Sequence, residues 1–271
     1  MNEEQLRVSI YGKYQADFDH LYALFRFAEK SLQGFRTDRA VRGDSHPAAL
    51  LFIFGRAFKL FDSIRRLCEV ASTQDAGVLL RCLLNLTAVN RWIGLDSEIR
   101  AKRYFDWYWV SLKQSSEQFP SDFSTAWLDK IDERFSLVKS QFEITKRGKT
   151  SLVSHWYQPL ANTLRDIFEQ TDLLTHYDDG YTVLSSLEHS DVRAFERMFP
   201  GTRTEGDSNI ELIDDKGIPP ILRNAFQYFG DIFLICNRQL PLADNRLLKQ
   251  ILDVDWPQHH GDAVYFVRNG G

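Results

Sequence analysis

The sequence predicts an all-α protein, a multi-helix bundle of about eight to nine helices. Apolar residues recur at steps of three and four residues over stretches much longer than a strand. Capping residues precede several of these stretches, and glycine or proline follows them. The composition, with 44% hydrophobic and 26% charged residues, is that of a soluble globular chain. A chain of 271 residues buries a substantial core and needs neither disulfides nor a structural metal to fold.

The first half of the chain carries consecutive helical stripes. They cover residues 18–32, 50–67, 78–93, 99–112 and 127–142. Ser45 and Pro47 form a helix-start signal ahead of the second stripe, which predicts a long helix. Asp96 and Ser124 are placed to cap the fourth and the fifth. Gly94 is placed to end the third, because glycine adopts the left-handed conformation that terminates helices.

The second half begins with a basic turn, Lys146-Arg147-Gly148-Lys149. A sixth helix is predicted from about Pro159 to Leu174, and a shorter one after Asp178-Asp179-Gly180. Residues 200–217 are polar and rich in glycine, which predicts a surface loop, and helical spacing resumes over 219–236 and 244–252. We expect one all-helical domain over 1–271, with a core at 14–254 and a C-terminal tail at 255–271. Two packed helical subdomains are the alternative.

The cysteines, the net charge and the hydropathy indicate the cellular compartment and the classes of binding partner. Cys68, Cys82 and Cys236 are odd in number and far apart, which argues against a disulfide framework or a thiolate metal site and favours a reducing cytoplasm. The longest apolar run, 48–55, is too short to span a bilayer, so we expect no membrane segment. A net charge of −4 does not favour nucleic acid, although it leaves it open. The 13% aromatic content favours a protein partner or a homodimer.

The most distinctive polar pattern is a row at four-residue steps, Tyr177-xxx-Tyr181-xxx-Ser185-xxx-His189. On one helix such a row lies along a slowly drifting stripe of a single face. Two phenols, a hydroxyl and an imidazole in line are able to orient or relay protons. The alternative is a partly buried ladder of hydrogen bonds that specifies how helices pack.

A second polar feature lies inside an apolar helix. Arg81 is surrounded by leucine, and Asn85 follows one turn later on the same face. A guanidinium at that depth needs acceptors, from Ser185, His189, Asn85, backbone carbonyls or an anionic ligand. Arg81 therefore either joins two helices or binds a ligand. Because the Tyr181 row is the other polar stripe expected to face inward, we predict that Arg81 and His189 lie within reach of each other.

These residues resemble a family. Leu79–Asn85, then Arg100 to Tyr104, then His155-Trp156, then the Tyr181, Ser185 and His189 row, is similar to an uncharacterised bacterial all-helical family known as a domain of unknown function. The resemblance covers about residues 45–195. It implies a helical fold, a shared cluster of arginine, tyrosine, serine and histidine, and a component of a bacterial stress or phage-defence system. Asn85 departs from the family, which usually has glutamate there.

The function that these observations favour is that of a cytoplasmic helical binding or interaction protein without a cofactor. Its expected ligand-binding residues are Arg81, Asn85, Trp156, Tyr177, Tyr181, Ser185 and His189. The alternative is a metal-independent ribonuclease of the helical HEPN type, in which His189 acts as general acid or base and Arg81 holds a phosphate. A weaker alternative uses His176, Asp178 and Asp179 as metal ligands. Their spacing matches no established metal motif, so no metal is expected.

Overall fold

The computed structural model describes residues 2–35, 45–181, 215–240 and 242–256. Its helices confirm the all-α prediction. The α-helices are α1 (Glu3–Lys13), α2 (Gln15–Gly34), α4 (Ser45–Glu69), α5 (Thr73–Leu95), α6 (Ser97–Gln118), α7 (Thr125–Val138), α8 (Leu164–Gln170), α11 (Ile218–Gln239) and α12 (Asn245–Leu252). Short turns of other helix types are η1 (Pro120–Asp122), η2 (Lys139–Phe142) and η3 (His176–Tyr181). Strands β1 (Glu143–Lys146) and β2 (Lys149–Leu152) form an antiparallel hairpin.

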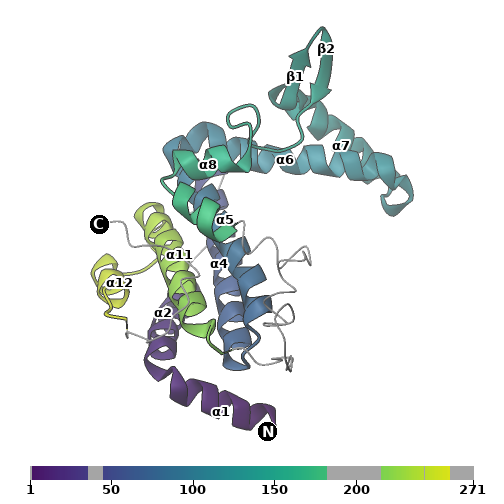
Figure 1. Cartoon of the computed structure of the whole chain (residues 1–271). Helices are drawn as coiled ribbons and strands as arrows, with labels where there is room; N and C mark the ends of the chain where they lie inside the picture. Colours follow the sequence, from purple (N-terminus) through teal and green to yellow (C-terminus); the bar gives the residue numbers. More distant parts are fainter. Residues whose placement is uncertain (1, 36–44, 182–214, 241, 257–271) are drawn as a thin grey trace, which may run out of the picture.

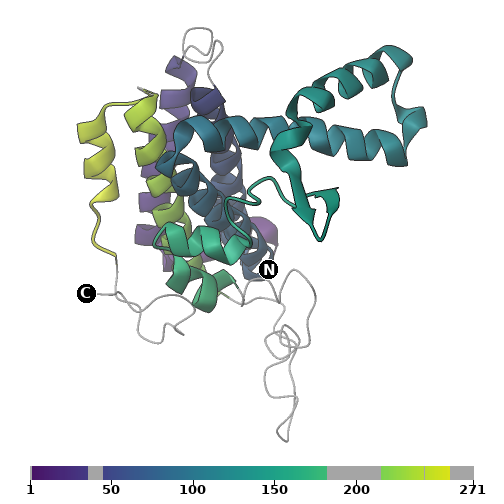
Figure 2. The ribbon, with the colours of Figure 1, turned by 90° about the horizontal axis from the view of Figure 1, so that it is seen from above.

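The main body is a bundle in which α2, α4, α5 and α11 lie side by side, with α12 against α2 and α11 (Figures 1 and 2). Aromatic rings fill the space between α4 and α11. The Phe61 and Phe229 rings stack with centroids 4.6 Å apart, and the Phe54 and Phe233 centroids are 4.8 Å apart. All four side chains are fully buried. Burial of these rings is the main force that holds the two helices together.

An arm leaves this bundle. It consists of the outer half of α6, the antiparallel α7 and the β1–β2 hairpin (Figure 1). The arm has a small core of its own, made by Val110, Val138, Phe142 and Val153. Arg103, at the root of the arm, is only 6% exposed. Its guanidinium donates to the backbone carbonyls of Trp156, Gln141 and Gln158.

Several helix boundaries agree with the sequence signals. Helix α4 begins at Ser45, α6 directly after Asp96 and α7 directly after Ser124. The Asp244 side chain accepts hydrogen bonds from the first backbone N–H groups of α12, as an N-cap does. Gly94 was predicted to end a helix, and this is wrong: α5 runs through it to Leu95.

The predicted helix from Pro159 to Leu174 is also wrong in extent, because α8 covers only Leu164–Gln170. Thr163 fixes its start through a capping box with Asp166. Asp172, with φ of 57°, takes the left-handed conformation just after its end. Gly180 lies within the π-helical turn η3, and the stretch that would hold the shorter helix predicted after it lies outside the described residues. The predicted loop at 200–217 lies outside the described residues except for its last three, and so does most of the tail.

Within the described ranges, α5 is long and apolar enough to cross a membrane, judged by length and composition alone. In the fold it contacts α4 and α11 along its length and α6 and α8 near its end. The inner helix of a bundle has the same length and composition as a membrane span. The expectation of no membrane segment stays a prediction.

Candidate functional site

The predicted polar cluster is centred on a contact between α5 and η3. Arg81 Nη2 donates a hydrogen bond of 2.7 Å to the Tyr181 hydroxyl. The same guanidinium lies 4.5 Å from the centroid of the Tyr181 ring. The tyrosine therefore holds the arginine in two ways, through its hydroxyl oxygen and through the negative face of its ring. The acceptor that Arg81 requires within its apolar stripe is thus a residue one hundred positions later in the chain.

The two tyrosines of the predicted row share a face, as their spacing indicates. The Tyr177 and Tyr181 rings are stacked, with centroids 4.9 Å apart and an interplanar angle of 12°. Both rings rest against Phe168 of α8. Burial raises the pKa of Tyr177, and the nearby Arg81 charge opposes that rise. The pKa is raised on balance, so Tyr177 is a neutral phenol at physiological pH.

Asn85 lies one turn beyond Arg81 but does not accept a bond from it. Its side-chain oxygen is buried and has no hydrogen-bond partner among the described residues. A buried acceptor without a donor costs roughly 1–3 kcal/mol. Asn85 is therefore a polar group that the packing of α5 leaves unsatisfied.

Trp156 belongs to a neighbouring aromatic cluster. Its ring makes edge contacts with Trp92 of α5, Tyr104 of α6 and Tyr157. Burial raises the pKa of Tyr157, and the nearby Tyr181 raises it further. Trp156 thus joins α5, the root of α6 and Tyr157.

Ser185 and His189 lie outside the described residues. Their place beside Arg81, and every catalytic role assigned to His189, stays a prediction. What the structure brings together is Arg81, Tyr181 and Tyr177, with Asn85 one turn away on α5.

A histidine that the sequence offered as a metal ligand has another partner. His176 Nδ1 is 2.9 Å from the hydroxyl of Tyr228, a buried residue of α11. Nearby, Arg91 of α5 pairs with Asp231 of α11 at 2.7 Å. Burial lowers the pKa of His176, the Arg91 charge lowers it further, and Asp179 acts in the opposite direction. His176 is therefore a neutral imidazole that fastens η3 to α11.

This environment predicts a pH dependence of stability. The unfolded chain protonates His176 near pH 6.5, whereas the folded chain does so only at lower pH. Stability is therefore fully present above about pH 7 and falls as the pH drops from the unfolded pKa towards the folded one. Urea unfolding at stepwise pH is expected to show a smaller acid loss in His176→Gln, because glutamine does not titrate. Equal losses in both proteins would contradict this assignment.

A second polar network, between α1, α2 and α4, has no counterpart in the sequence predictions. Glu69 is 8% exposed and accepts from Tyr22, Arg65 and Arg7. Arg65 also donates to Asp62 one turn earlier on α4. The spacing of Asp62, Arg65 and Glu69 was a usable signal, because residues three and four apart meet on a helix. Every charge in this network is paired, so we interpret the network as a structural contact that holds α1, α2 and α4 together.

Metal chemistry gains no support from the described residues. In these ranges no group of three or more histidine, cysteine, aspartate or glutamate side chains is close enough to hold an ion. Of the candidates in the sequence, His176 bonds to Tyr228, and Asp178 pairs with Arg165 at 3.2 Å.

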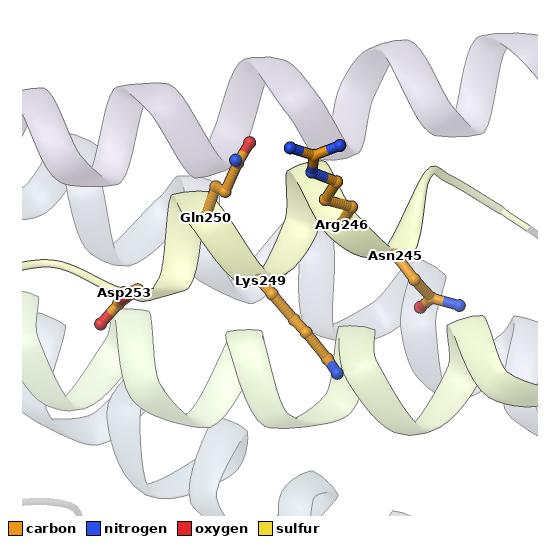
Figure 3. Close-up of a pocket in the computed structure, with 5 residues that line it drawn as sticks. All are labelled: Asn245, Arg246, Lys249, Gln250 and Asp253. Carbon is orange, nitrogen blue, oxygen red and sulfur yellow. The ribbon is translucent and has the colours of Figure 1, made fainter.

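An open hollow of about 490 Å³ lies beside α12 (Figure 3). Its lining side chains are Asn245, Arg246, Lys249, Gln250 and Asp253. Arg246 and Gln250 point towards the ribbon of α2, and Lys249 points towards α11. Because the lining comes from one helix and the residue that follows it, the hollow lacks the converging groups of a ligand site.

Exposed aromatic rings gather where α6 crosses the first turns of α4. Phe52 of α4 is 56% exposed, and Tyr108 of α6 is 51% exposed. The Tyr104 ring centroid lies 6.3 Å from that of Phe52, and Tyr104 precedes Tyr108 by one helical turn on the same face of α6. We call Phe52, Tyr104 and Tyr108 the aromatic face. It spans two helices at the angle between the bundle and the arm.

A family model described as a family of unknown function (DUF5677) matches residues 48–207, more than half of the chain. The chain belongs to this family. No curated protein and no solved structure matches it. The resemblance to a domain of unknown function is thereby confirmed.

The DUF5677 span includes the arm and both candidate regions. Arg81, Asn85 and Tyr181 lie within it, as do Phe52 and Tyr108 of the aromatic face. Helices α1, α2, α11 and α12 lie outside it, although α11 supplies the buried wall of the bundle. The part shared with DUF5677 is thus completed by helices from both ends of the chain.

Proposed function

We propose that this chain is a helical interaction protein that associates with a second copy of itself through the aromatic face. The observation that carries the proposal is the joint exposure of Phe52 and Tyr108, on two helices, around the partly buried Tyr104. Single exposed apolar residues are ordinary, whereas adjoining aromatic rings are typical of interface centres.

The shape of the molecule supports a second copy as the occupant. The arm extends away from the bundle, so α4 and α6 present an open angle (Figures 1 and 2). In a two-fold dimer the same patch is used by both copies, and each arm then covers the bundle of the other. An interface of standard size buries about 800 Å² on each partner. The surfaces of two long helices that meet at an angle are able to supply this area.

The cysteines support the cytoplasmic setting that we assign to this protein. Cys68, Cys82 and Cys236 all lie in described ranges, and each is a free thiol. Burial raises the pKa of Cys68 and of Cys236, which keeps both as unreactive thiols. Such residues are typical of proteins that remain in reducing compartments.

Light scattering is expected to give twice the chain mass of 31.5 kDa at micromolar concentration. The double variant Phe52→Glu/Tyr108→Glu is expected to give the single mass, because two charges at the centre of an apolar interface are costly to bury. The matched control is Val8→Glu/Leu247→Glu, on α1 and α12, where the side chains are 66% and 48% exposed.

The control is expected to stay dimeric, and circular dichroism verifies that each variant remains helical. A wild-type protein with the single-chain mass would refute the proposal. A dimer that survives in the Phe52/Tyr108 variant would show that another surface forms it.

A further inference from the structure

We infer that the tip of the β1–β2 hairpin binds the phosphate backbone of duplex DNA. The tip is the exposed segment Thr145–Ser151, with the sequence Thr-Lys-Arg-Gly-Lys-Thr-Ser. It projects from the side of the arm, away from the bundle (Figure 1). The net charge of −4 for the whole chain conceals this local concentration of positive charge.

The charges of the tip are arranged at a cost to the hairpin. Lys146 and Lys149 are direct partners in the strand register, and Arg147 lies between them in the turn. Like charges placed opposite each other destabilise a two-stranded ribbon. In the described part of the chain, none of these three cations forms an ion pair. The one acidic residue of the hairpin, Glu143, is at its base and pairs with Lys139 at 3.2 Å. An anion bound at the tip relieves this repulsion.

The turn itself presents the charges outward. Arg147 and Gly148 have φ of 51° and 74°, the two left-handed residues of a tight hairpin turn. Gly148 suits this conformation, but asparagine or aspartate is the usual choice at the position of Arg147. Arginine in left-handed backbone costs conformational energy and places a guanidinium at the extreme end of the ribbon.

The base of the hairpin is held firmly. Val153 N–H donates to Phe142 C=O at 2.8 Å, and both side chains are buried in the small core of the arm. Ile144 and Leu152, one from each strand, pack against the same core. Arg103 binds the carbonyl of Gln141 just before the hairpin. A ribbon anchored in this way loses little further freedom when it binds, which favours affinity.

The composition of the tip selects the ligand class. Between residues 145 and 151 the side chains are cationic or hydroxylic, with one glycine. Lysine, arginine, serine and threonine are the residue types that contact phosphate oxygens. A tip that enters a membrane surface usually carries apolar or aromatic side chains beside its cations. The major groove of B-form DNA admits a two-stranded ribbon, whereas that of A-form RNA is too narrow.

The test measures binding of a fluorescent DNA duplex of about two helical turns by anisotropy at several salt concentrations. The variant Lys146→Gln/Arg147→Gln/Lys149→Gln removes three charges. If each cation neutralises one phosphate, the log–log salt slope becomes shallower by about 2.7. Between ~50 and ~200 mM salt the wild-type protein therefore loses about 40-fold more affinity than the variant does.

The control variant Arg238→Gln/Arg246→Gln/Lys249→Gln removes the same charge from exposed positions on α11 and α12; Figure 3 shows Arg246 and Lys249. It is expected to keep the wild-type slope. Equal loss in both variants would overturn the site, because it would show a response to total charge. Absence of DNA binding in the wild type, tighter binding to an RNA duplex of the same sequence, or capture only by phosphatidylserine vesicles would also overturn it.

Discussion

Replacement of Arg103 by alanine is expected to lower the free energy of unfolding by about 3–5 kcal/mol. Arg103 Nε donates to the Trp156 carbonyl at 2.7 Å, and the other two guanidinium nitrogens donate to Gln141 and Gln158. The guanidinium also lies 4.3 Å from the centroid of the Phe142 ring. Burial lowers the pKa of Arg103, so these contacts compensate a real desolvation cost. Alanine leaves three carbonyls without their donor.

The measurement is urea unfolding followed by tryptophan fluorescence and by circular dichroism. Half of the six tryptophans, Trp107, Trp109 and Trp127, lie in the arm, so fluorescence weights the arm more heavily than circular dichroism, which reports mainly on the larger bundle. A single domain gives coincident transitions, and two packed subdomains give an earlier transition of the arm. Lys102→Ala, at the exposed neighbouring position, is the control. An Arg103→Ala protein within about 0.5 kcal/mol of the wild type would contradict the role of this residue.

The helices that the sequence predicts best are those in which periodicity and a cap coincide. Ser45 and Asp244 mark the starts of α4 and α12 because local hydrogen bonding and steric fit decide where a helix begins. The contact of Arg81 with Tyr181 was also accessible, since a guanidinium in an apolar stripe requires an acceptor and the sequence offers few inward-facing polar residues.

The hydrogen-bond partners of Arg103 could not be predicted from the sequence. Its acceptors are backbone carbonyls 38 to 55 residues away, and a carbonyl has no residue type by which it can be recognised. His176 likewise bonds to Tyr228, 52 residues later, and its neighbour Asp178 made it resemble a metal ligand instead. Tertiary packing selects such partners.

The hairpin was missed for a local reason. Its strands have four residues each, and the turn is Arg147-Gly148 rather than the Asn-Gly or Asp-Gly pair that identifies hairpins in sequence. Only its base contacts a core, through Ile144 and Leu152. The alternation that reveals a half-buried strand is therefore too short to detect.

Replacement of Arg81 by alanine is expected to lower the free energy of unfolding by about 2–4 kcal/mol. A hydrogen bond from a charged donor contributes roughly 1.5–3 kcal/mol and a cation–π contact about 0.5–2 kcal/mol. Arg81 makes both to Tyr181, at 2.7 Å and 4.5 Å. The loss also weakens the attachment of η3 to α5, because Tyr177 and Tyr181 stack as a unit on Phe168.

The matched variant is Tyr181→Phe, which keeps the ring and removes only the hydroxyl. It is expected to cost about 1.5–3 kcal/mol, the value of one hydrogen bond from a charged donor, because the ring still receives the guanidinium. If Arg81 serves catalysis instead, Arg81→Ala and His189→Ala both abolish cleavage of a labelled RNA and leave the melting temperature nearly unchanged, since groups held for function are often held at a cost to stability. A large loss of stability without any change in RNA cleavage establishes Arg81 as the residue that joins η3 to the bundle.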